Sequence, residues 1–287
     1  TNHNLFDSVR TATKYISSNL TNAEATNANT LTAFNASTTS AGAGFTLGTD
    51  ASAIGVNVNA ATYVAWEWLA GGGTPTSGTG TSGVTNVQYS ANPSVGFSVV
   101  IYTGSGTSGA TVTHGLGATP NMIIIKARTD PTPDPMNWVT QHSSLSGGVA
   151  ASSSTFTLSN YTSVLYLNLT NAAGAYTMDG QVNKNTINYV AYCWTAITGY
   201  SSFGSYTGNG AADGPFIFTG FRSRFVMLKR TDAASDWWIY DTTRQGYNVE
   251  GPELYPDASS AEVTSTRFDN LSNGLKIRAS GGSNPNV

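Results

Sequence analysis

Short stretches of alternating or continuous apolar residues run along this chain, and glycine-rich turns separate them. The stretches are rich in β-branched and aromatic residues, which is typical of strands. We saw no run of ten or more residues with a convincing helical period. The pattern therefore predicts an all-β protein, with strands at 97–102, 121–126, 164–169, 189–194, 203–206, 216–218, 225–229, 237–240 and 274–278.

The same order of short motifs occurs more than once. A Tyr-Thr-Gly-x-Gly motif, an apolar strand that leads to Thr-Asp, and a Trp-containing strand follow each other twice, and parts of the pattern recur near the amino terminus. The matched pairs are 102–106 with 206–210, 122–130 with 225–232, 137–142 with 236–241, 5–10 with 239–244, and 62–68 with 188–194. A period near 100 residues is the size of one small domain. We therefore expect tandem antiparallel β-sandwich repeats of about 100 residues.

The repeats divide the chain into four parts. We expect a partial β repeat at 1–70, a Gly/Ser/Thr-rich linker at 71–95, a β-sandwich repeat at 96–197, and a second one at 198–287 that lacks its last strand. Tyr63, Trp66, Trp138, Trp194 and Trp237 are expected in or near the cores. A missing strand leaves an open sheet edge. Either more chain completes the edge, or a neighbouring subunit supplies the strand.

Composition narrows the function classes. Charged residues make up 10% and aromatic residues 11%, which disfavours disorder and fits β-structure. The net charge is −3 and no basic run exceeds two residues, so we expect no nucleic-acid binding. Apolar runs are too short for membrane insertion, and residues 1–5 lack signal-peptide features, so the chain begins mature or inside something longer. Cys193, the single cysteine, is expected to be a buried, inert thiol.

The sequence offers no catalytic constellation, and we expect the protein not to be an enzyme. The three histidines lack metal-ligand spacing, and no Gly-x-Ser-x-Gly elbow occurs. Glu67 stands between two tryptophans, as acids in sugar-cleaving clefts often do, but its counterpart in the next repeat is Cys193. The motif 114–117 is predicted to be a turn that uses glycines with positive φ.

Two weaker candidate sites remain. Asp130 and Asp134, and likewise Asp232 and Asp236, are four residues apart in loops before a tryptophan, where carboxylates could hold Ca²⁺; turn initiation by Asp is the simpler alternative. Three aromatic residues have no aromatic counterpart in the other repeat, which makes them candidates for stacking on sugar rings. These are Trp238, Tyr247 and Tyr161.

The ordered motifs at 206–216, 219–222, 229–232, 237–244 and 271–278 resemble a repeat module of tailed-bacteriophage virion proteins. The likeness is strongest to tail-fibre-like proteins of aquatic and cyanobacterial phages, and no catalytic residues are carried over from that module. The resemblance implies a virion protein on the particle surface: a tail fibre or receptor-binding adhesin that recognises host surface polysaccharide. The alternatives are a capsid or tail decoration protein and, from another class, a polysaccharide-degrading enzyme.

Assembly is the last expectation. A surface poor in charge can pack against copies of itself without desolvating many ions, and open strand edges favour association. By analogy with phage fibres we expect a homo-oligomer, either a trimer or a head-to-tail filament, in contact with other virion proteins.

Overall fold

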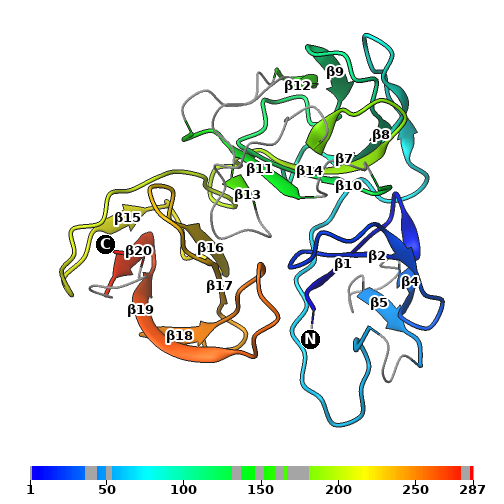
Figure 1. The fold of residues 1–287 in the computed structure, drawn as a ribbon. Coiled ribbons are helices and arrows are strands. Elements are labelled where there is room, and N and C mark those ends of the chain that lie inside the picture. Colours follow the sequence, from blue (N-terminus) through cyan, green and yellow to red (C-terminus); the bar gives the residue numbers. More distant parts are fainter. Residues whose placement is uncertain are drawn as a thin grey trace.

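The chain folds into three groups of strands (Figure 1). A computed structural model describes residues 2–35, 44–49, 54–130, 137–145, 152–158, 165–166, 181–278 and 285–286. We call the groups the N-terminal lobe (β1 to β5), the central lobe (β6 to β14) and the C-terminal lobe (β15 to β20). The described residues are almost all strand, turn and loop, with residues 181 and 182 in helical geometry. The all-β expectation is confirmed.

The central lobe contains a seven-stranded antiparallel sheet. Its strand order is β13 (Leu165–Tyr166), β11 (Trp138–His142), β10 (Met122–Ala127), β14 (Asn188–Trp194), β8 (Phe97–Thr103), β7 (Thr85–Asn92) and β6 (Thr76–Ser77). Strand β14 pairs with β10 on one side and with β8 on the other. Both its faces are buried, which explains why its sequence is apolar throughout rather than alternating.

A hairpin of β9 (Ala110–Thr113) and β12 (Thr155–Leu158) belongs to the core on one face of this sheet. Ile123, Tyr189 and Cys193 point into this core, as do Val112 and Phe156 of the hairpin. The lobe is therefore a β-sandwich. The turn at 114–117 is confirmed: Gly115 and Gly117 have positive φ, and a Cβ on Gly115 would lie 2.2 Å from the Tyr89 ring.

The predicted linker at 71–95 is wrong for its second half. Strand β7 occupies 85–92 and pairs with β8, and β6 pairs with β7. Val84 and Val87 are buried in the sandwich core, with Tyr89 packed against it. Val87 and Tyr89 alternate with polar residues along β7, so burial of one face outweighs the glycine- and threonine-rich composition of this stretch.

The two outer lobes are built from smaller sheets. The N-terminal lobe contains β1 (Asn4–Asp7), β2 (Thr11–Ser17), β3 (Ala25–Thr26), β4 (Leu31–Asn35) and β5 (Gly44–Leu47). The C-terminal lobe contains β15 (Phe216–Phe218), β16 (Phe225–Lys229), β17 (Trp237–Asp241), β18 (Glu250–Glu253), β19 (Val263–Leu271) and β20 (Gly274–Ile277). In the latter, the sheet β15-β20-β19-β18 lies beside the hairpin β16–β17, and Ile239 and Leu254 bridge the two.

A second core, the shared core, joins all three lobes on the other face of the seven-stranded sheet. Ile16 of β2, Trp138 of β11, Tyr192 of β14 and Trp237 of β17 are buried in it together. Trp138 and Trp237 occupy matched positions of the motif pattern and are core residues as expected. They pack in one common core rather than in the separate core of each repeat. The three lobes therefore pack against one another and are not separate units joined by linkers.

The hairpins β10–β11 and β16–β17 share one register. Lys126 lies opposite Trp138 in the first, and Lys229 lies opposite Trp237 in the second. The sequence match between these hairpins therefore reflects a match in structure. The structure does not establish repeats of whole sandwich domains.

One predicted strand is absent, because residues 203–206 have no strand assignment. Residues 62–68, which match β14 in sequence, have none either. Tyr63, expected near a core, is 50% exposed, whereas Trp66 and Trp194 are partly buried. Strand formation requires a pairing partner as well as a suitable sequence, and neither segment has one among the described residues.

An Asp-x-x-Arg corner occurs in both outer lobes with the same hydrogen bonds. Arg10 N donates to Asp7 Oδ1 (2.8 Å) and Arg244 N donates to Asp241 Oδ1 (3.1 Å), and in both corners the Arg Nε donates to Asp Oδ2. In each, an aromatic residue from the Tyr-Val-Ala-x-x-Trp motifs completes the corner. Tyr192 donates its hydroxyl proton to Asp7 Oδ2 (2.9 Å), and Trp66 Nε1 donates to Asp241 Oδ2 (3.1 Å).

Candidate functional site

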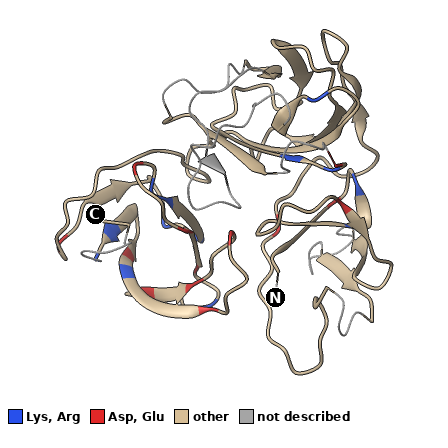
Figure 2. Ribbon diagram, viewed as in Figure 1, with Lys and Arg blue, Asp and Glu red and all other residues tan. Residues whose placement is uncertain are grey.

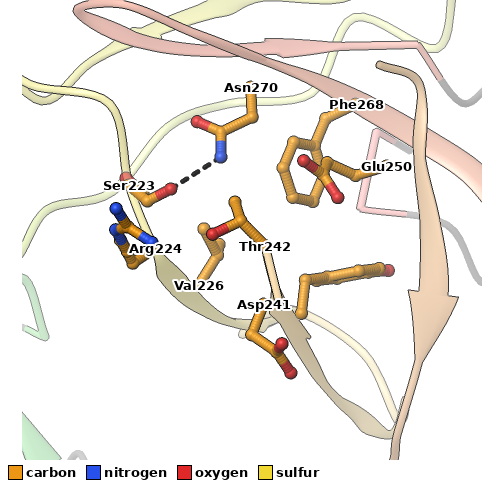
Figure 3. A pocket seen from close by; sticks show the side chains of 9 residues that line it. Ser223, Arg224, Val226, Asp241, Thr242, Glu250, Phe268 and Asn270 are labelled. Atoms are coloured by element: carbon orange, nitrogen blue, oxygen red, sulfur yellow. Dashed lines mark hydrogen bonds between the residues drawn. The ribbon is translucent and has the colours of Figure 1, made fainter. Parts of the chain in front are cut away.

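A small recess lies in the C-terminal lobe between β16, β17, β18 and β19 (Figure 3). Its walls combine apolar and polar side chains: Ser223, Arg224, Val226, Tyr240, Asp241, Thr242, Glu250, Phe268 and Asn270. These side chains pack so closely that the recess has no room for a water molecule. A ligand bound at this lobe would therefore lie on the surface beside the recess and not inside it.

Two buried oxygen atoms of this recess have no hydrogen-bond partner among the described residues. Glu250 is 2% exposed, and its Oε1 has no hydrogen-bond partner among the described residues; the same holds for Asn270 Oδ1. Asn270 Nδ2 donates to Ser223 O (2.7 Å), which fixes the direction of the amide (Figure 3). Burial raises the pKa of Glu250. Buried polar atoms are usually hydrogen-bonded, so these two oxygens are exceptions to that rule.

The loop that carries Tyr247 connects two residues of the recess wall, Thr242 and Glu250. Tyr247 is 74% exposed. Arg222 Nη2 donates to Gly246 O (3.0 Å), and within the loop Gln245 Nε2 donates to Val249 O (2.7 Å), so two side chains hold the loop backbone. Asn248 Oδ1 accepts from Asn270 N (2.8 Å), which ties the loop to the recess wall. Tyr247 is therefore an exposed aromatic ring on a fixed loop.

The three aromatic candidates have different surroundings. Tyr247 is exposed, as a stacking residue must be. Trp238 is 2% exposed and packs in the core of the C-terminal lobe with Tyr240 and Phe268, so it has no face free for a ligand. Its lack of an aromatic counterpart reflects a different core rather than a ligand site. Tyr161 lies outside the described residues.

The Asp pairs give no assembled metal site in the described part of the chain. Arg230 pairs with Asp232 (2.6 Å), and this contact lowers the pKa of Asp232. Asp236 is half-buried and Asp130 is exposed, while Asp134 lies outside the described residues. No three His, Cys, Asp or Glu side chains among the described residues gather closely enough to hold a metal ion. The Arg230–Asp232 contact favours a turn with a local ion pair.

Other singled-out residues have structural surroundings. Cys193 is buried, as expected, and burial raises the pKa of its thiol. His114 is buried, and its Nδ1 accepts from Leu116 N (3.2 Å) within the turn. Glu67 is exposed on the segment between the lobes.

Sequence reasoning missed Glu250, Asn270 and Asn248. No motif marks them, because the recess is formed by strands and loops distant in sequence. The one usable signal was indirect. Tyr247 was selected because it has no aromatic counterpart in the other repeat, and these three residues lie beside its loop.

Charged residues are scattered over all three lobes, with acidic and basic positions interspersed (Figure 2). Within the described residues, no helix is long and apolar enough to cross a membrane.

The family model described as a domain of unknown function, DUF7483, matches residues 1–286. The chain therefore belongs to the DUF7483 family. No curated protein and no solved structure matches the chain.

Proposed function

We propose that this protein is a non-enzymatic component of a tailed-bacteriophage virion, a tail fibre or receptor-binding adhesin on the particle surface. The motif order at 206–278 that resembles tail-fibre-like proteins supports this proposal. The tight packing of three lobes around a shared core agrees with a part that must resist shear.

The ligand we propose is a host surface polysaccharide, bound at Tyr247. The observation that carries this step is the 74% exposed Tyr247 ring on a loop that Arg222 and Asn270 hold by hydrogen bonds. A tyrosine ring can stack on the apolar face of a sugar ring. An exposed ring on a fixed loop suits contact with the side of a long chain better than enclosure of a single sugar.

Retention on immobilised host polysaccharide tests the proposal. We expect wild type to be retained without release of new reducing ends, and Tyr247→Ala to lose at least tenfold in affinity. Tyr200→Ala is the matched control, because Tyr200 is also exposed (55%) but lies outside the recess and its loop. New reducing ends would indicate an enzyme instead. Equal retention of both variants would remove Tyr247 from the site, and no retention of wild type would favour a decoration protein.

We also propose that the protein functions as a homo-oligomer, either a trimer or a filament, and contacts other virion proteins. Residues 62–68 and 203–206 have strand-forming sequences but pair with no strand among the described residues, which supports self-association because free strand edges recruit partners. Sedimentation velocity over a micromolar concentration series tests it, and a monomer at every concentration would count against it.

A further inference from the structure

The arginines of this chain divide into two groups. All eight lie in the described part of the chain, and six of them form ion pairs with an aspartate or glutamate there: Arg10, Arg128, Arg230, Arg244, Arg267 and Arg278. Arg222 and Arg224 form no such pair within the described chain, and both are exposed. In a chain that pairs most of its arginines, these two positive charges are available to a partner outside the chain.

The two unpaired arginines lie beside the loop that carries Tyr247. Arg222 Nη2 donates to Gly246 O (3.0 Å), and Thr242 N donates to Arg224 O (3.1 Å). The segment that carries both arginines therefore runs along the first half of the loop, and Arg224 also lines the recess (Figure 3). One small region of the C-terminal lobe thus combines an exposed aromatic ring with two exposed guanidinium groups.

In the described chain, no exposed carboxylate neutralises these two charges. Asp241 and Glu262, which lie near the loop, both pair with Arg244 (2.7 Å each). Glu250, at the end of the loop, is 2% exposed, and burial raises its pKa against the opposing effect of Arg222. The carboxyl group of Glu250 is therefore not accessible to a ligand on the surface. The surface around Tyr247 has an excess of positive charge, although the whole chain carries a net charge of −3.

The side chains around Tyr247 also offer hydrogen-bond donors rather than acceptors. Asn248 is exposed, and its Oδ1 accepts from Asn270 N (2.8 Å), which leaves the Nδ2 hydrogens for a partner outside the chain. Arg222 uses only Nη2, on Gly246 O, and the Arg224 side chain has no hydrogen bond within the described chain. Sugar hydroxyls both donate and accept, whereas ionised acid groups only accept. A donor-rich surface with excess positive charge therefore fits acid groups best.

We propose that the polysaccharide bound at Tyr247 is acidic, and that Arg222 and Arg224 bind its carboxylate or sulfate groups. The planar guanidinium group pairs with such groups through two parallel hydrogen bonds, while the tyrosine ring stacks on a neighbouring sugar. Nucleic acid fits less well, because two arginines on a chain of net charge −3 fall far short of the basic surface that it requires. The inference names the ligand class of the proposed adhesin and rests on that proposed function.

Three polymers with one backbone test the charge of the ligand: neutral dextran, carboxymethyl-dextran and dextran sulfate. The full-length chain is titrated with each polymer by calorimetry at low and at physiological salt. We expect both acidic polymers to bind about tenfold more tightly than neutral dextran, and the difference to shrink as salt screens the exposed charges. The tighter of the two acidic polymers identifies the acid group that the site prefers. Equal binding of all three, or binding of none, would overturn the proposal.

Arg224→Gln is the decisive variant, because the Arg224 side chain holds no part of the loop. We expect it to weaken binding of the acidic polymers by about tenfold, through loss of a charge-assisted hydrogen bond, and to leave the melting temperature unchanged. Arg222→Gln should weaken binding as well, and Arg222→Lys, which keeps the charge, should restore part of it. The control is Arg230→Gln, which removes the same charge at the far end of β16, where Arg230 pairs with Asp232. It should bind like wild type.

The outcomes separate this inference from the proposed function. If host polysaccharide requires Tyr247 but the arginine variants bind the acidic dextrans like wild type, the inference is overturned while the proposed function stands. If the acidic dextrans require both arginines and Tyr247→Ala binds them normally, the acid-binding site is supported and Tyr247 is not part of it. If Arg230→Gln weakens binding as much as Arg224→Gln does, net charge alone accounts for the effect and the inference is overturned.

Discussion

The Asp-x-x-Arg corners of the N-terminal and C-terminal lobes have the same bonds in different environments. In the first, the Arg10 side chain is fully buried and bonds Asp7, Glu24 and Tyr192. In the second, Arg244 reaches Glu262, whose side chain is 45% exposed, and Trp66 is only half-buried. The same set of hydrogen bonds should therefore contribute differently to stability in the two lobes, because the surrounding lobe determines how deeply the corner is buried.

The pKa shifts of the ionisable groups in the two corners also reflect burial and pairing. Burial by itself would lower the pKa of Arg10, but Tyr192, Asp7 and Glu24 together raise it. Burial raises the pKa of Tyr192, so its hydroxyl keeps the proton that it donates to Asp7. Burial would raise the pKa of Asp241, yet Arg244 and the backbone lower it. Both corners hold their ions by pairing, and at the N-terminal corner both partners are buried.

The largest expected effect is at the N-terminal corner. Arg10→Ala leaves the buried Asp7 carboxylate without its cation, and breaking a buried pair in this way costs about 3–5 kcal/mol of unfolding free energy. Urea denaturation followed by tryptophan fluorescence measures it, with Arg128→Ala as a control that removes a less buried partner of Glu24. A loss below about 1 kcal/mol would place the corner with ordinary surface ion pairs.

Lys126 and Lys229 occupy matched positions in the two hairpins, and the pH dependence of stability can compare their burial. Burial lowers the pKa of Lys126 to about 7, and its Nζ donates to Thr21 O (3.0 Å). The unfolded chain therefore binds more protons than the native one between pH 7 and about 10, so stability rises with pH by up to about 1.4 kcal/mol per unit. Lys126→Met should flatten this rise between pH 7 and 9.

Lys229 is the internal control for that experiment. Its pKa is also lowered by burial, but Asp257 and Asp236 oppose the shift. Lys229→Met should therefore change the pH slope less than Lys126→Met does. A stability that does not depend on pH between 7 and 9 in wild type would show that Lys126 is not desolvated.

At the C-terminal corner the same arginine substitution should cost less. Arg244→Ala leaves Glu262 to be solvated, while Asp241 keeps bonds from Trp66 Nε1 and from Thr243 N (3.0 Å). We expect a loss of about 1–3 kcal/mol, the cost of one buried acceptor left short of a partner. The same urea denaturation measures this loss. A loss equal to that of Arg10→Ala would show that solvent exposure does not determine how much the corner contributes to the free energy of unfolding.

The comparison also shows what the sequence could predict. The strands of the central lobe were predictable because β10 and β14 are apolar runs between turns, and Trp138 and Trp237 were correctly expected to be core. Strand β7 was missed because composition was weighed above the alternation of Val87 and Tyr89. Tyr63 was misplaced because its burial depends on strands that the described chain does not pair with it. The corners were visible as a repeated Asp-x-x-Arg, but the contact of Tyr192 with Asp7 joins residues far apart in sequence, which periodicity cannot show.

The smallest expected effects are at the aromatic members of the corners. Tyr192→Phe removes a hydroxyl that donates to Asp7 and accepts from Arg10 Nη2 (3.0 Å), so it should cost about 1–2 kcal/mol at a fully buried site. Trp66→Phe removes one donor to Asp241 at a half-buried site, where water can replace it, and should cost about 0.5–1 kcal/mol. A double-mutant cycle of Tyr192→Phe with Arg10→Ala isolates the direct coupling, which Trp66→Phe with Arg244→Ala should show more weakly. If the second cycle gave the larger coupling, the segment around Trp66 would be held more firmly than its exposure indicates.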